Sequence, residues 1–113
     1  MSNDNNECVR ESLGDYVLVR LKGEVDLSWS QQVRKAILDA LGDSQKVGVE
    51  LSEVSYIDSS GIAALVEGFQ SAREKGQKFD LVAASKAVMA VLQLARLDRV
   101  FVMFPSLEAA RAA

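Results

Sequence analysis

Apolar and polar residues alternate through the first part of the chain. Over residues 16–22 the alternation predicts a strand whose two faces differ in burial, with two valines and a leucine on the better buried face. A weaker alternation over residues 8–13 predicts a second strand, and the turn pair Gly14-Asp15 joins the two. We therefore expect an antiparallel hairpin that ends at Gly23.

After the hairpin the apolar spacing changes to that of helices. Ser28 is the expected N-cap of a first helix that stops at Gly42, and a second helix stops at Gly76. Ser85 is expected to cap a third helix, and Ser106 to begin a short Ala-rich fourth helix. The buried stripes of the first two helices are Trp29, Val33, Ala36, Ile37, Ala40 and Leu41, and then Ile62, Leu65, Val66, Phe69 and Ala72.

Short apolar runs between these helices predict three more strands, over residues 47–51, 79–84 and 100–104. Strands that alternate with helices imply a largely parallel sheet, and the opening hairpin adds an antiparallel pair. The sequence thus predicts an α/β domain over residues 7–113, with a mixed, mainly parallel sheet of about five strands and about four helices packed alongside. Residues 1–6 are expected to form a polar, flexible end.

Composition excludes several kinds of chemistry. The 113-residue chain contains no His and a single Cys, which removes His-based acid–base catalysis, Cys/His metal sites and a disulfide framework. Its formal net charge of −3 and its pI near 4.9 argue against nonspecific binding to nucleic acid. No apolar run approaches the roughly 18–20 residues of a membrane span, and the acidic, polar start is the reverse of a signal peptide. A cytoplasmic protein that does not insert into a membrane is therefore expected.

The segment Asp58-Ser59-Ser60-Gly61 is the strongest candidate for function. It follows the strand expected at 47–51 and precedes the second helix, and functional groups in parallel α/β sheets collect on the turns beyond the carboxyl ends of strands. Three capping-type residues in succession are more than one helix end requires. A hydroxyl here also lies at the positive end of the helix dipole, where an attached phosphate is accommodated.

Small residues on the second helix form another candidate surface. Ala64, Gly68 and Ser71 recur at helical spacing, on the side expected to lie opposite the buried stripe. A glycine inside a helix costs roughly 0.8–1.0 kcal/mol relative to alanine, so close approach of another surface is one explanation for Gly68. Docking of a partner and packing by another part of the same domain are equally compatible with this pattern.

Three segments of the chain resemble the STAS domain, and more narrowly the bacterial anti-sigma factor antagonists. They are Gly23-Glu24-Val25-Asp26, Ile57-Asp58-Ser59-Ser60-Gly61-Ile62 and Val82-Ala83-Ala84-Ser85. The resemblance extends from Val17 to Ala110, and the Asp-Ser-Ser-Gly turn is its most specific part. It implies a mixed sheet with helices packed alongside, which agrees with the element order given above.

In proteins of this family the serine directly after the aspartate is phosphorylated, and that serine corresponds to Ser59 here. The resemblance implies that a serine kinase, itself the anti-sigma factor, adds the phosphate and that a phosphatase removes it. The unphosphorylated antagonist binds the kinase and releases the sigma factor. Such a protein is not an enzyme and needs no cofactor or metal. The alternative is an accessory STAS subunit of an ABC-type lipid-transport complex at the inner membrane, bound to its ATPase, although such subunits often lack the complete turn.

The residues and the resemblance together define the candidate site. Ser59 is the expected phosphorylation site, with Ser60 as second choice. Asp58 is expected to shape the turn by accepting backbone hydrogen bonds. Asp26 either contacts the kinase or is a turn carboxylate that leads into Ser28. The full set expected at the partner surface is Asp26, Asp58, Ser59, Ser60, Gly61, Ala64, Gly68 and Ser71.

Overall fold

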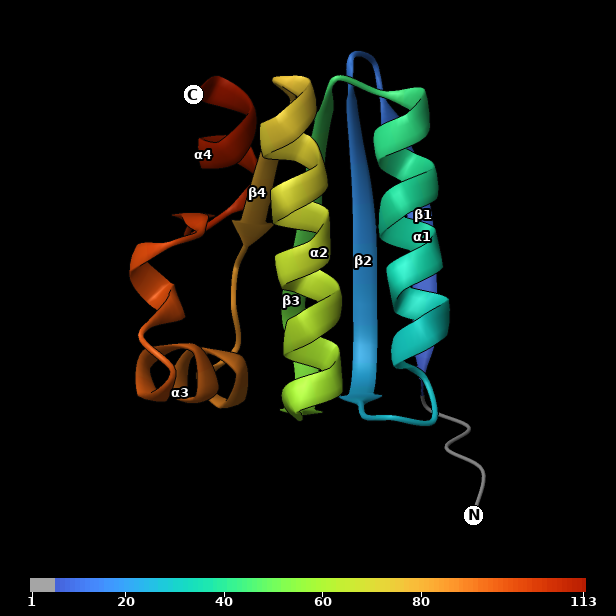
Figure 1. The fold of residues 1–113 in the computed structure, drawn as a ribbon. Helices are drawn as coiled ribbons and strands as arrows, with labels where there is room; N and C mark the ends of the chain where they lie inside the picture. The colour runs from blue at the N-terminus through green and yellow to red at the C-terminus, as the bar shows by residue number, and fades with distance from the viewer. Residues whose placement is uncertain (1–5) are drawn as a thin grey trace.

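A single sheet runs through the part of the chain that the computed structural model describes, residues 6–113 (Figure 1). Its five strands lie in the order β1-β2-β3-β4-β5. β1 pairs with β2 antiparallel, and the other neighbouring pairs are parallel, which confirms the predicted α/β class and mixed sheet. The strands are β1 (Glu7–Leu13), β2 (Tyr16–Val25), β3 (Lys46–Ile57), β4 (Lys78–Val82) and β5 (Val102–Phe104).

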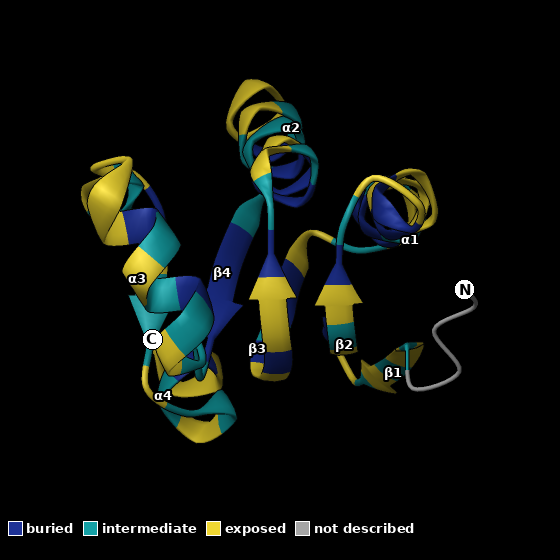
Figure 2. Ribbon diagram, turned by 90° about the horizontal axis from the view of Figure 1, so that it is seen from below, coloured by how far each residue is buried: buried dark blue, intermediate teal, exposed yellow. Residues whose placement is uncertain are grey.

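Helices cover the two faces of the sheet unequally. α1 (Ser30–Asp43) and α2 (Ser59–Lys75) lie side by side on one face, whereas the short α4 (Leu107–Ala112) lies on the other (Figure 2). α3 (Lys86–Leu94) and the 3-10 helix η1 (Leu97–Arg99) follow the carboxyl end of β4. Within residues 6–113 we find no helix that is both long enough and apolar enough to cross a membrane.

Two apolar clusters hold these layers together. The larger one lies between the sheet and the α1–α2 layer and takes its side chains from alternate positions of β2, β3 and β4. The smaller one lies under α4 and consists of Tyr16, Leu18, Val82 and Ala110. Successive strand residues point to opposite faces of the sheet, so the side chains of one strand are divided between the two clusters.

The helix ends predicted at Gly76, Ser85 and Ser106 are confirmed, whereas Gly42 does not end α1, which continues to Asp43 with Ser44 as its C-cap. Ser85 and Ser106 each accept a hydrogen bond at the side chain from the backbone amide three residues later. Gly76 ends α2 in the left-handed conformation, with φ of 67°. The prediction that Ser28 caps α1 is wrong, because Trp29 occupies the N-cap position and no side chain caps this helix.

β3 is longer than the sequence predicts. It continues past residue 51 to Ile57, and its extension stays paired with β2 although β4 has already ended. Two register shifts between β2 and β3, each with an extra residue in β3, accompany the extension, and Val54 and Ile57 remain buried along it. The segment 52–57, beyond the strand predicted at 47–51, is therefore also strand, and the turn that follows it is short.

The last two strands are shorter than predicted. The segment expected at 79–84 ends at Val82, because Ala83 adopts a positive φ of 53°. The segment expected at 100–104 is a strand only over 102–104, because the Val100 amide donates to the Leu97 carbonyl oxygen and so closes η1. β5 consequently pairs with the second half of β4 only.

The predicted flexible end falls outside the described residues except for Asn6. The Asn6 side chain donates to the Glu24 carbonyl oxygen at 3.1 Å and accepts from the Glu24 amide at 2.8 Å. These two bonds attach Asn6, the residue before β1, to β2 near its end.

One polar group lies deep in the sheet. The Asp80 carboxylate is fully buried, accepts hydrogen bonds from the Tyr16 hydroxyl at 2.9 Å and the Lys78 ammonium at 3.2 Å, and forms an ion pair with Lys78 at 3.0 Å. The Tyr16 ring reaches Asp80 by crossing β3 at Gly48, where an added Cβ would lie 2.1 Å from the tyrosine oxygen. Burial and the neighbouring Asp80 raise the pKa of Tyr16 far above its ordinary value, so the phenol stays protonated and keeps donating.

Candidate functional site

The Asp-Ser-Ser-Gly turn lies at the edge of the sheet where the parallel strands end. β3 stops at Ile57, Asp58 is the N-cap, and α2 begins at Ser59 (Figure 1). The Asp58 amide donates to the Val25 carbonyl oxygen at 3.2 Å, which joins the turn to the last residue of β2. The turn therefore occupies the position where α/β proteins place their functional groups.

Asp58 organises the turn with its carboxylate. One carboxylate oxygen accepts from the Ser60 amide at 2.9 Å, the Gly61 amide at 3.2 Å and the Ser60 hydroxyl at 2.6 Å. These bonds, of which the Ser60 hydroxyl is the strongest influence, lower the pKa of Asp58 below its ordinary value. The prediction that Asp58 shapes the turn by accepting backbone hydrogen bonds is confirmed.

The two serines of the turn differ in accessibility. The Ser60 hydroxyl is directed at Asp58 and the residue is only partly exposed. Ser59 is exposed, and its hydroxyl has no hydrogen bond to any residue in the range 6–113. Of the two hydroxyls, that of Ser59 is the one an enzyme can reach without first breaking a bond inside the turn.

Asp26 organises a second turn beside the first. Its carboxylate accepts from the Ser28 amide at 3.0 Å and from the Ser28 hydroxyl at 2.5 Å, and its carbonyl oxygen accepts from the Trp29 and Ser30 amides. The structure shows Asp26 as a turn carboxylate that leads into Ser28, and its contact with a kinase stays a prediction. Ser28, although not the N-cap, is held just before α1.

The small residues on α2 face the interior of the domain. Ala64 is 4% exposed, and a Cβ added at Gly68 would lie 2.6 Å from Cγ2 of Ile37 on α1 and 3.0 Å from the Phe79 ring. The prediction that this stripe faces away from the buried side is wrong for these two residues, while Ser71 is partly exposed. Packing within the domain, the other alternative for Gly68, explains the glycine, because α1 and α2 approach each other closely there.

Close packing also explains why residue 61 is a glycine. A Cβ at this position would lie 2.8 Å from the Val25 carbonyl oxygen and 2.7 Å from Cγ1 of Ile57. The first turn of α2 is therefore seated directly on the ends of β2 and β3, and a side chain at residue 61 would lift it away.

Two exposed apolar side chains near the turn were not predicted to be functional. Leu27 is 74% exposed and lies in the loop between β2 and α1, where its backbone amide contributes to the low pKa of Asp58. Tyr56 is 50% exposed at the end of β3, opposite Glu24. A single apolar residue in a loop or at a strand end carries no distinct sequence pattern, so only the structure places both at the same edge as Ser59.

The described residues provide no cluster that suits a metal ion. No group of three or more Cys, His, Asp or Glu side chains close enough to share a metal is found in residues 6–113. The chemistry present at the edge is a set of carboxylates and hydroxyls arranged around backbone amides. This arrangement leaves the Ser59 hydroxyl exposed while Asp58 holds that of Ser60.

Replacement of Asp58 by Asn is expected to destabilise the domain by about 0.3–1 kcal/mol at pH 7, because the amide still caps α2 but the negative charge at the N-terminal end of the helix is lost. The pKa of Asp58 is lowered on folding, so its contribution is complete above the unfolded-state pKa of about 4 and is lost as the pH falls through the folded-state pKa. Urea denaturation of wild type and Asp58→Asn at pH 7 and pH 3 measures the difference in the free energy of unfolding, which is expected to be smaller at pH 3. A difference that stays the same at both pH values would contradict the assigned role.

Comparison with known proteins identifies related sequences and folds. The STAS domain family matches residues 8–110. An anti-sigma-B factor antagonist from Listeria monocytogenes is 24% identical over 91 residues, which are 80% of each chain. Most of the chain, including both turns at the sheet edge, therefore lies within the matched region.

Solved structures share the fold over nearly the whole chain. An anti-sigma factor antagonist from Mycobacterium paratuberculosis has a TM-score of 0.88 at 24% identity and covers 98% of this chain and 95% of its own. The Bacillus cell fate determinant SpoIIAA in its phosphorylated form has a TM-score of 0.73 at 22% identity, with 94% and 98% coverage. The sheet order and helix placement described above are thus those of these solved domains.

Proposed function

The chain belongs to the STAS domain family, and from that premise we propose that it is an anti-sigma factor antagonist switched by phosphorylation of Ser59. In the unphosphorylated form it binds a serine kinase that is also the anti-sigma factor, and the sigma factor is released. A phosphatase returns the modified form to the binding state. The observation that carries this proposal is the exposed Ser59 hydroxyl on the first residue of α2, beside a Ser60 hydroxyl that Asp58 already holds.

The geometry of the turn supports a switch that leaves the fold intact. A phosphate on Ser59 adds roughly −1.5 to −2 charge units at pH 7. The N-terminal end of α2 accommodates this charge, because its amides and the helix dipole favour an anion. Ser59 is exposed, so the phosphate displaces no core side chain. Within the domain the modification therefore costs little, and its effect falls on whatever docks against the turn.

The partner surface is proposed to be the sheet edge around Ser59. Leu27 and Tyr56 supply apolar area that a partner can bury, and aromatic residues are common anchors in interfaces. Asp26 and Asp58 supply carboxylates at the same edge. A partner that fits this edge has an apolar pocket with basic groups at its margin, shaped for a neutral serine. A phosphate at Ser59 then meets both desolvation and a misplaced charge.

The chain is proposed to act by binding and to carry out no reaction of its own. At this edge of the sheet, no basic side chain among residues 6–113 hydrogen-bonds to Ser59. Nothing there therefore activates the Ser59 hydroxyl as a nucleophile. A cytoplasmic location follows from the same proposal, because the sigma factor and its kinase act there.

Incubation with a candidate anti-sigma serine kinase, together with ATP, tests the proposal. Mass spectrometry is expected to find one phosphate, on Ser59, and Ser59→Ala is expected to accept none. Ser60→Ala serves as the matched control and should still be phosphorylated. If no such kinase modifies residue 59 or 60, and a transporter ATPase binds the chain instead, the accessory-subunit function replaces this one.

A further inference from the structure

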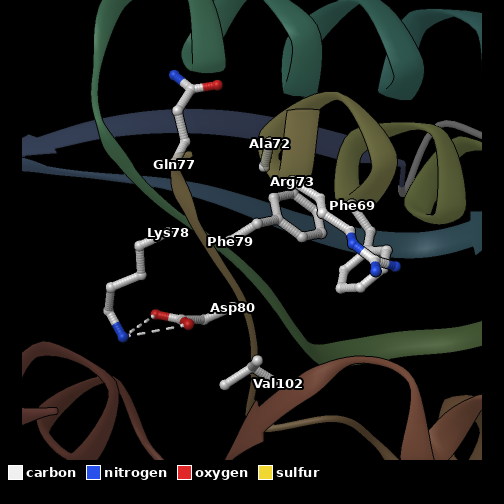
Figure 3. Close-up of a pocket in the computed structure, with 8 residues that line it drawn as sticks. All are labelled: Phe69, Ala72, Arg73, Gln77, Lys78, Phe79, Asp80 and Val102. Atoms are coloured by element: carbon white, nitrogen blue, oxygen red, sulfur yellow. Dashed lines mark hydrogen bonds and ion pairs between the residues drawn. The ribbon is translucent and has the colours of Figure 1, made fainter. Parts of the chain in front are cut away.

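A cavity of about 330 Å³ lies at the opposite end of α2 from Ser59 (Figure 3). It exists because β5 pairs only with the second half of β4, so that Lys78 and Phe79 have no strand on their outer side. The last turns of α2 form one wall, and Val102, the first residue of β5, closes the other side. Its volume is at the lower end of the range of small-molecule sites.

Four apolar and four polar residues line this cavity. The apolar ones are Phe69, Ala72, Phe79 and Val102, and the polar ones are Arg73, Gln77, Lys78 and Asp80. The Phe69 ring contacts the buried Phe101 ring edge to face, with centroids 5.6 Å apart and an interplanar angle of 74°. A flat apolar group that enters therefore meets aromatic surface that is already fixed, and it orders few side chains on binding.

The charges at the cavity leave one cation without a partner. Lys78 binds the carboxylate of Asp80 and lies 4.8 Å from the centre of the Phe104 ring, so its charge is largely satisfied inside the protein. Arg73, on the last turn of α2, is exposed, and no salt bridge to it is found within residues 6–113. Figure 3 shows Arg73 among the side chains that line the cavity. Two cations and one carboxylate give the cavity a net positive charge.

We propose that this cavity binds a small apolar carboxylate, with the apolar body between Phe79, Phe69 and Val102 and the carboxylate on Arg73. The planar guanidinium matches a carboxylate in a two-point contact, which is the geometry that arginine favours. The cavity volume suits a single ring with a short acidic arm. A cationic ligand of the same shape is repelled, and a neutral one gains only the apolar contacts.

The site is independent of the proposed switch. Ser59 and Arg73 lie at opposite ends of one helix, and a rise of 1.5 Å per residue separates them by about 21 Å. A ligand in the cavity therefore leaves the edge around Ser59 accessible. Ser59→Asp is expected to bind the carboxylate as wild type does, so this inference stands or falls separately from the proposed function.

Titration of the full ¹⁵N-labelled chain with phenylacetate, followed by amide chemical shifts, tests the inference. Saturable shifts are expected at residues of the cavity, with a dissociation constant of about 1 mM. The neutral analogue 2-phenylethanol and the variant Arg73→Gln are each expected to bind at least about tenfold more weakly, because each removes the charged contact. Lys75→Gln is the matched control: it removes a cation from the same last turn but does not line the cavity, and it is expected to bind normally.

Either of two kinds of result, a missing signal or a signal that does not depend specifically on Arg73, would overturn the inference. One is the absence of saturable shifts at the cavity at 20-fold above that dissociation constant, in a protein whose spectrum shows the native fold. The other is equal binding of phenylacetate by wild type and Arg73→Gln, or an equal loss in Arg73→Gln and Lys75→Gln, which would show that general surface charge attracts the ligand.

Discussion

Ser59→Asp is expected to weaken binding to the anti-sigma kinase by about 100-fold, whereas Ser59→Ala is expected to bind as tightly as the unphosphorylated wild type. A factor of 100 corresponds to about 2.7 kcal/mol. The physical reason is that the new carboxylate must be desolvated against a surface shaped for a neutral hydroxyl, and unfavourable charge placement in an interface costs several kcal/mol. Isothermal titration calorimetry on the three proteins measures the effect.

The stability of the variants separates an effect on docking from an effect on folding. Ser59 is exposed at the first position of α2, where an acidic residue is favourable for the helix. The urea concentration at the midpoint of unfolding is therefore expected to be at least as high for Ser59→Asp as for wild type. Leu27→Ser is a useful companion, since it removes exposed apolar area from the same edge and leaves the charge unchanged. Tight, equal binding by Ser59→Ala and Ser59→Asp would contradict the switch.

Gly48→Ala is expected to destabilise the domain by about 2–3 kcal/mol, which is the largest stability effect that we expect from adding a single methyl group. The new Cβ would lie 2.1 Å from the Tyr16 hydroxyl oxygen and 2.8 Å from Cζ of the same ring. Tyr16 is only 2% exposed, so the ring has no free space to enter. If it moves, the buried Asp80 carboxylate loses a hydrogen bond, which adds a desolvation cost.

Gly42→Ala provides the control for this substitution. Gly42 lies inside α1, and a Cβ there would have no atom within 4 Å. The variant is expected to be more stable than wild type by about 0.5–1 kcal/mol, because alanine favours the helix over glycine. Urea denaturation of both variants gives the comparison. A Gly48→Ala protein as stable as wild type would show that the Tyr16 ring is not confined as described.

The local hydrogen bonds of the site could be predicted from the sequence, and the direction in which the small residues of α2 face could not. Asp58 bonds to amides two and three residues later, so its role depends only on its immediate neighbours. Gly68 depends on Ile37, which is distant in sequence, and helical spacing alone does not say which stripe meets another helix. On α2 both the large and the small residues are covered, because α1 and the sheet approach it from different sides.

The lengths of β3 and β5 also differ from the sequence-based prediction, because each depends on the element beside it. The extension of β3 to Ile57 depends on β2 continuing beside it through two register shifts, and such shifts leave no periodic signal in the sequence. The short β5 likewise follows from the 3-10 turn closed by Val100, and the cavity beside Arg73 exists only because β5 is short.

The sequence by itself determined the α/β class, the order of the elements, most helix caps and the Asp-Ser-Ser-Gly turn, because each of these follows from periodicity or from hydrogen bonds between neighbours along the chain. Only the tertiary structure decided that Ser59 rather than Ser60 carries the accessible hydroxyl and that Leu27 and Tyr56 lie at its edge. It also decided that Ala64 and Gly68 are buried. The physical reason is that burial and exposure depend on which distant segments pack together, and a single sequence does not specify those contacts.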